Sequence, residues 1–205
     1  MYKQFLSKRN IMVFAMIIAL GGCTAATSNL NPDLNFYTVP LYLVEYTPKI
    51  DAAKYAQFSG KKICLSNIRN DAGNTTNFGY YSKDKRIQYE LSNKANTIVM
   101  LAQNYFWYAY QKAFLKVGLE ASTDCSPKNT PELWIIFQSL NDEELKMKIT
   151  VLKNRETLYE KDLAVTMPPV EYRSIPGLQK RAYEMIDLTV SAILDDPGLQ
   201  DMLLK

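Results

Sequence analysis

Three cysteines and no histidine limit the chemistry that this chain can perform. Without histidine there is no imidazole base for a nucleophilic triad, and a metal site would have to use carboxylates and cysteines. Cys64 and Cys125 stand about 60 residues apart, a spacing unlike that of a redox-active CxxC pair. In an oxidising compartment they form either a disulfide, which stabilises the fold by about 4 kcal/mol through loop-closure entropy, or two buried free thiols.

Two acidic runs are the remaining candidates for chemistry. Asp142-Glu143-Glu144 falls between two expected strands, where an acidic run usually forms a solvated turn. Asp195-Asp196-Pro197 is typical of a helix end. The sequence contains no GxSxG, P-loop, GxGxxG or HExxH motif. We therefore expect no metal site, no cofactor and no enzymatic activity.

The third cysteine, Cys23, follows the pattern of an export signal. Lys3, Lys8 and Arg9 precede ten consecutive apolar residues, Ile11 to Leu20, with no acidic residue before them. Ten residues of helix cover only about 15 Å, half of a ~30 Å hydrocarbon core, so this segment is too short for a transmembrane helix.

Leu20-Gly21-Gly22-Cys23 resembles the lipobox of bacterial lipoproteins. The resemblance implies cleavage between Gly22 and Cys23, and acylation of the Cys23 thiol. Two or three acyl chains attach a protein to a membrane stably, whereas one does so only marginally. Thr24 occupies the position where Asp favours inner-membrane retention, so the resemblance implies an outer-membrane protein that faces the periplasm. The alternative is an ordinary signal peptide with a chance cysteine at its end.

Charge and length define the rest of the chain. Once residues 1–22 are removed, 21 cationic and 21 acidic residues remain, so the mature chain is formally neutral. A neutral chain offers no basic surface for nucleic acid. We expect three parts: a signal peptide at 1–22, a lipidated cysteine with a flexible tether and an extended segment at 23–59, and a periplasmic α+β domain at 60–205.

The elements of the domain follow from hydrophobic periodicity. Short strands are expected at 62–68 and 133–137, and alternating residues predict a hairpin of 145–151 with 158–167. A helix from 94 to 117 ends at Gly118 and buries a stripe of residues spaced by threes and fours. That stripe contains Ile98, Ala102, Tyr105, Phe106, Ala109, Ala113 and Val117.

Three further segments complete the expected fold. A second helix begins near Pro176. Pro40 restricts the segment 36–46 to an edge strand at most, and 73–93 is expected to be a long exposed loop. The fold class predicted is α+β, in β-α-β-β-β-α order, with a small and mostly antiparallel sheet and two main helices packed on one of its faces.

Aromatic residues give the candidate contact surfaces. Trp107, Tyr108 and Tyr110 lie around most of the first helix; they either cover a neighbouring segment such as 36–46 or form an exposed patch for a partner or lipid. A second candidate surface is the loop 73–93. It contains three aromatic residues, Phe78, Tyr80 and Tyr81. The alternative for this loop is a disordered excursion.

Beyond the signal, residues 60–205 resemble the YajG-type family of small lipoproteins. The resemblance rests on the first strand with its Asp/Arg-containing turn (Ile63 to Asp71), on Asn77-Phe78-Gly79, on Val117-Gly118-Leu119 and on Leu194 to Leu199. Two other lipoprotein groups are more distantly similar: the auxiliary lipoproteins of ABC-type lipid transport, through Phe36-Tyr37-Thr38-Val39-Pro40, and the lipoprotein that plugs the lipopolysaccharide export barrel.

Three functions are compatible with these features. The first is a non-enzymatic, lipid-anchored accessory or assembly factor that binds another envelope protein. The second is an auxiliary lipoprotein that handles lipid or glycolipid for an envelope transport system, and it predicts an apolar groove. The third, an enzyme, would require a deep pocket that holds carboxyl groups with raised pKa values.

Overall fold

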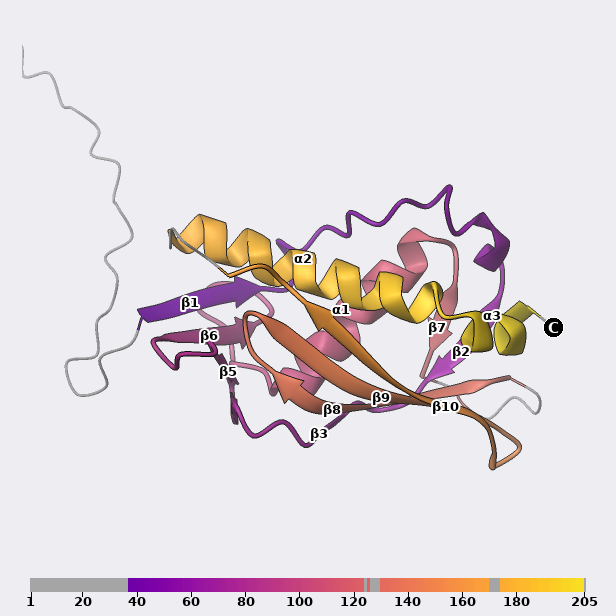
Figure 1. Ribbon diagram of the computed structural model, residues 1–205. Helices are drawn as coiled ribbons and strands as arrows, with labels where there is room; N and C mark the ends of the chain where they lie inside the picture. Colours follow the sequence, from indigo (N-terminus) through magenta and orange to yellow (C-terminus); the bar gives the residue numbers. More distant parts are fainter. Residues whose placement is uncertain (1–36, 124, 126–129, 170–173, 205) are drawn as a thin grey trace, which may run out of the picture.

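The computed structural model describes residues 37–123, 125, 130–169 and 174–204, which form two mixed β-sheets and three α-helices (Figure 1). The elements have the following bounds, in chain order: β1 Tyr37–Tyr42, the 3-10 turn η1 Ala56–Phe58, β2 Lys62–Leu65, β3 Arg69–Asn70, β4 Thr75–Thr76, β5 Gly79–Tyr81, β6 Ile87–Ser92, α1 Ala102–Lys116, β7 Glu120–Ser122, β8 Glu132–Leu140, β9 Glu144–Lys153, β10 Glu156–Thr166, α2 Ile175–Leu194 and α3 Pro197–Leu204.

The smaller sheet has the strand order β1-β6-β5-β4. β1 pairs in parallel with β6 and is an edge strand, as predicted from Pro40, which has no amide hydrogen for a second partner. β4, β5 and β6 are antiparallel neighbours. The prediction of a long exposed loop at 73–93 is therefore wrong: the strands are short, and Tyr80 and Tyr89 stack with their ring centroids 4.7 Å apart in the core.

The larger sheet has the order β10-β9-β8-β2-β7, and β3 also pairs with β8. The predicted hairpin is confirmed as β9 and β10, which are joined by a two-residue turn in which Asn154 and Arg155 both have positive φ. β8 contains the strand predicted at 133–137 and lies between β9 and β2. β2 runs parallel to both β7 and β8, so the sheet is mixed.

The helices pack against each other and against both sheets. α1 contacts α2, β7, β3 and β6, while α2 contacts β10 and β1. Phe106 of α1 meets Phe137 of β8 edge to face at 5.2 Å, which places α1 on the buried face of the large sheet. α2 begins at the expected place, where the Ser174 side chain accepts a hydrogen bond from the Gly177 amide at 3.2 Å.

The predicted fold class is wrong in its sheet. The structure has two mixed sheets instead of one small, mostly antiparallel sheet with two helices on one face. The parallel pairs β1–β6 and β2–β7 join segments that are distant in the sequence, and no local pattern shows such pairing. The first helix also begins eight residues later than predicted, at Ala102, and Ile98 is exposed instead of buried. No helix among the described residues is long and apolar enough to cross a bilayer.

Candidate functional site

The expected lipidation site, Cys23, and the cleavage position after Gly22 lie outside the described residues. The other two cysteines are joined: a disulfide links Cys64 of β2 to Cys125, which follows β7, with 5.2 Å between their Cα atoms. Cys64 is fully buried and Cys125 is exposed. The bond therefore ties the interior of the large sheet to the surface segment beside β7.

The same two cysteines and Glu132 form a possible metal-ligand cluster within the described residues. Their ligand atoms lie within 4.8 Å of one another. In the disulfide, however, neither sulfur is a thiolate, and thiolate is the form that binds metal. The Glu132 carboxylate already accepts a hydrogen bond from the Ser66 hydroxyl at 2.9 Å. The arrangement is therefore a structural clamp between strands.

The candidate contact residues divide into buried and exposed members. Tyr110 and Tyr80 are buried in the core, and Tyr81 is half-buried. Trp107 is half-buried, and its indole nitrogen donates a hydrogen bond to the Leu65 carbonyl at 3.2 Å. Tyr108, whose ring packs edge to face on Trp107 at 4.8 Å, is exposed on α1.

Phe78 is the second exposed residue of that set, in the turn between β4 and β5. Its neighbour Gly79 is required there, because a Cβ at this position would overlap the Tyr89 carbonyl. Of the six candidate contact residues, Tyr108 and Phe78 are therefore the exposed ones. Tyr108 belongs to α1 and Phe78 to a turn of the small sheet.

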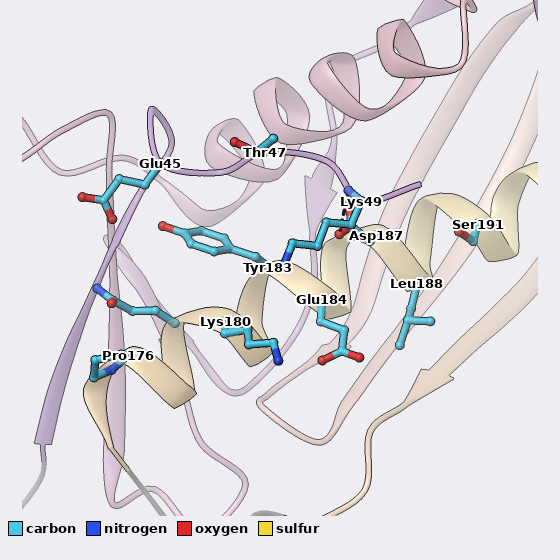
Figure 2. Close-up of a pocket in the computed structure, with 11 residues that line it drawn as sticks. Glu45, Thr47, Lys49, Pro176, Lys180, Tyr183, Glu184, Asp187, Leu188 and Ser191 are labelled. Atoms are coloured by element: carbon cyan, nitrogen blue, oxygen red, sulfur yellow. Dashed lines mark hydrogen bonds between the residues drawn. The ribbon is translucent and has the colours of Figure 1, made fainter. Parts of the chain in front are cut away.

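A groove of about 810 Å³ runs along α2 (Figure 2). One wall is the segment after β1, and the other is the outer side of α2. Nine of its eleven lining residues are of charged or polar type; the lining comprises Glu45, Thr47, Lys49, Pro176, Gln179, Lys180, Tyr183, Glu184, Asp187, Leu188 and Ser191. Among these residues only Pro176 carried a sequence signal, as the start of a helix, and none was predicted as a site residue.

Asp187 is the polar centre of this groove. Its carboxylate accepts a hydrogen bond from the Tyr46 hydroxyl at 2.7 Å and one from the Lys49 amide at 3.2 Å. Burial raises the pKa of the Asp187 carboxyl above its usual value, although these two hydrogen bonds oppose the shift. Burial, together with the bond to Asp187, also raises the pKa of the Tyr46 hydroxyl. This pair is locked in place and is not an exposed acid or base.

Side chains from both helices hold the segment 43–50 that forms the groove wall. The Tyr183 hydroxyl of α2 donates to the Tyr42 carbonyl at 3.0 Å. From the opposite side, the Lys112 ammonium of α1 donates to the carbonyls of Leu43 and Tyr46 at 2.9 and 2.5 Å. Burial lowers the pKa of Lys112. The segment therefore forms a fixed ridge between α1 and α2.

The acidic run at 142–144 has a structural role in the turn between β8 and β9. Asp142 is buried and accepts a hydrogen bond from the Lys83 amide at 2.9 Å. Glu143 pairs with the Lys83 ammonium at 2.9 Å, and Glu144 pairs with Lys146 at 2.9 Å. The two contacts of Lys83, which lies between β5 and β6, link the small sheet to the large one.

Comparison with known proteins places the fold and leaves the chemistry open. No family model and no curated protein matches the sequence. The structure is similar to the crystal structure of a Xanthomonas campestris protein of the family DUF330, with a TM-score of 0.54 and 8% identity, over 77% of this chain and 91% of that one. A second crystal structure, of an uncharacterised protein, has a TM-score of 0.42 and 8% identity, over 78% of this chain and 95% of that one.

At 8% identity the likeness to the DUF330 protein shows a shared fold only. The resemblance predicted from the sequence is supported at that coarse level. The groove along α2 lacked a sequence signal because its central contact, Tyr46 to Asp187, joins residues 141 positions apart. Polar residues on the outer side of an amphipathic helix are otherwise ordinary solvated positions.

Proposed function

We propose that this chain is a lipid-anchored periplasmic lipoprotein, attached through Cys23, that acts as a non-enzymatic accessory or assembly factor and binds another envelope protein along α2. The observation that carries the binding part of this proposal is the 810 Å³ groove and its charge pattern. Lys180 and Glu184 are exposed at its rim and form no ion pair within the described chain. Such unpaired rim charges select a complementary protein surface and speed its association.

The construction of the groove supports binding better than catalysis. Its one half-buried acid, Asp187, is engaged by Tyr46 and by the Lys49 amide, so it is not free to accept a proton from a substrate. The chain has no histidine to activate Ser191, which also lines the groove. A charged and polar rim is typical of a protein-contact groove.

The lipid-handling alternative needs an apolar groove that encloses acyl chains. The groove along α2 does not suit it, because Glu45, Lys49, Lys180 and Glu184 would face the hydrocarbon. The apolar hollows of the molecule lie instead beside α1 and are open to solvent.

Site-specific photo-crosslinking in cells tests this proposal. A benzophenone amino acid replaces Lys180 in the full-length chain. In the matched control it replaces Gln138, which is exposed on the face of β8 that points away from α1. We expect one abundant envelope protein to be crosslinked from position 180 and not from position 138. An adduct-free chain, or the same adducts from both positions, would overturn the proposed groove.

A pulldown of the full-length chain from detergent-solubilised envelopes discriminates between the two functions. A stoichiometric envelope protein that is lost in the Lys180→Glu, Glu184→Lys double variant supports the accessory role. Enriched phospholipid or glycolipid without any protein partner supports the lipid-handling role instead.

A further inference from the structure

The outer side of α1 and the segment before it carry an unusual set of exposed apolar side chains. Ile98 is 89% exposed, Leu115 68%, Tyr108 47% and Leu101 40%. Leu101, Tyr108 and Leu115 are spaced by seven residues, which places them in one line along the helix. We call these four residues the α1 face.

Two open hollows make the α1 face continuous with the segment after β1. One, of about 540 Å³, lies between Leu115 and β7, and the other, of about 500 Å³, lies beside Ile98 and Leu101. Tyr108 and Leu43 line both hollows. The apolar surface therefore extends over the whole length of α1 and continues beyond its first turn.

The charged residues of the chain segment that carries the α1 face have one sign. The stretch from Asn93 to Leu119 contains Lys94, Lys112 and Lys116 and no acidic residue, although cations and acids balance in the chain without residues 1–22. The acid that lines the hollows, Glu120, is paired with Lys62 at 3.1 Å. Exposed aliphatic and aromatic side chains flanked only by lysines are the pattern of a surface that lies in the interface of an anionic bilayer.

We propose that the α1 face docks on a lipid surface that carries anionic headgroups. In this arrangement Ile98, Leu101 and Leu115 enter the acyl boundary, and Tyr108 lies at headgroup depth, where aromatic side chains are favoured. Lys94 and Lys116, which form no ion pair within the described chain, meet the phosphates. This inference deepens the proposed function and rests on it for the anchor at Cys23.

The position of the anchor supports a bilayer as the occupant. The 14 residues from Cys23 to Phe36 precede β1 and span at most about 50 Å when fully extended. β1 itself covers about 20 Å and leads directly to Leu43 at the edge of the α1 face. An anchor at Cys23 thus keeps a bilayer within reach of the α1 face, while the ridge 43–50 separates that face from the groove along α2.

The two tryptophans of the chain provide a direct test. Trp107 lies on α1 against Tyr108, whereas Trp134 is exposed on the face of β8 that points away from α1. Trp134→Phe leaves Trp107 as the only reporter, and Trp107→Phe leaves Trp134. Each lipidated full-length variant is reconstituted in vesicles of phosphatidylglycerol and brominated phosphatidylcholine. The emission is compared with that in vesicles without bromine.

We expect bromine to lower Trp107 emission roughly twofold and to leave Trp134 emission nearly unchanged, because bromine quenches only indoles that lie close to the acyl chains. The double variant Ile98→Glu, Leu115→Glu in the Trp107 reporter should lose this quenching while its near-UV circular dichroism is unchanged. The matched control, Thr157→Glu with Leu158→Glu, adds the same two charges at exposed positions of β10 and should keep the quenching.

Flotation of the vesicles separates failure of this inference from failure of the anchor. A chain that floats without Trp107 quenching, or with equal quenching of both tryptophans, overturns the docking of the α1 face and leaves the anchor intact. A chain that neither floats nor shows quenching contradicts both proposals. Quenching that is unchanged by Ile98→Glu, Leu115→Glu also overturns this docking mode.

Discussion

α1 and α2 are neighbouring amphipathic helices that pack against each other, yet their outer sides differ in chemistry. α1 presents Leu101, Tyr108 and Leu115, and the chain segment that carries them, Asn93 to Leu119, contains lysines and no acid. α2 presents an alternation of Lys180, Glu184 and the half-buried Asp187 beside a wide groove. Both helices bury an apolar stripe in the core, so the two stripes do not distinguish the helices. The outward residues do, and they are the basis for proposing a lipid partner for α1 and a protein partner for α2.

The ridge 43–50 between the two helices is held by opposite charges from its two sides. α1 contributes the cation Lys112, which binds backbone carbonyls, and α2 contributes the anion Asp187, which binds a hydroxyl and an amide. Each helix thus supplies the polar groups that the backbone of the ridge lacks. If the two proposed surfaces are independent, each one depends on its own set of supports.

Removal of the disulfide should have the largest effect on stability, and it should loosen the α1 side of the molecule more than the α2 side. It closes a loop of 61 residues, so the Cys64→Ala, Cys125→Ala double variant should lose about 4 kcal/mol of unfolding free energy. β7, which the disulfide borders, lines the hollow below Leu115 and does not contribute to the groove along α2. Hydrogen exchange should therefore speed up more in β7 and α1 than in α2. Equal acceleration in both helices would contradict the separation of the two sides.

The second largest effect should come from Asp187→Ala. It leaves the fully buried Tyr46 without the acceptor of its hydroxyl and should cost about 1–3 kcal/mol in urea denaturation. Glu184→Ala, one turn earlier on α2 and exposed, is the matched control and should change stability by less than about 0.5 kcal/mol. A loss that is equal in the two variants would show that Asp187 does not support the ridge.

Elements that depend on neighbouring residues were predictable from the sequence. The hairpin β9–β10 follows from the alternation of Leu145, Met147, Ile149 and Val151, and the end of α1 follows from Gly118, whose φ is +78°. The start of α2 follows from Ser174 and Pro176. These signals act within a few residues and are unaffected by the rest of the fold.

Features that join distant residues were not predictable. The small sheet pairs β1 with β6 across about 50 residues, and strands of two or three residues, such as β4 and β5, are too short to show a period. Ile98 fitted the helical period but precedes the first turn of α1, so it faces solvent. The groove along α2 required the position of the ridge, and the ridge is set by contacts such as Tyr46 to Asp187.

A smaller effect is expected at the α1 support of the ridge. Lys112→Met keeps the aliphatic stem but removes the donor to the carbonyls of Leu43 and Tyr46, which should cost about 1 kcal/mol in urea denaturation. Lys116→Met, an exposed lysine of the same helix, should leave stability unchanged and is the control. If Lys112→Met costs more than Asp187→Ala, the α1 support is the stronger one and the comparison between the two helices is reversed.

The smallest effect should be the pH dependence of stability caused by two carboxyl groups, Asp187 of α2 and Asp196, which lies between α2 and α3. Burial raises the pKa of Asp187 above 3.8 in the folded protein. Burial acts in the same direction on Asp196, but bonds from Lys161, Tyr159 and the Leu199 amide outweigh it and hold that pKa below 3.8. A raised pKa means that the folded state binds the proton more tightly, so stability is lost as the pH rises through that value; a lowered pKa means that stability is lost as the pH falls.

The two carboxyl groups should therefore produce opposite slopes. The unfolding free energy of the wild type relative to Asp187→Asn should decrease as the pH rises from about 4 towards neutrality, while that relative to Asp196→Asn should decrease as the pH falls below about 4. Urea denaturation between about pH 3 and pH 7 measures both differences, each of the order of 1 kcal/mol or less. Two slopes of the same sign would mean that the hydrogen bonds to the Asp187 carboxylate outweigh its burial. A difference that does not change with pH would mean that Asp187 is solvated like a surface acid. The wall of the groove would then be mobile, and a protein partner would have to order it on binding.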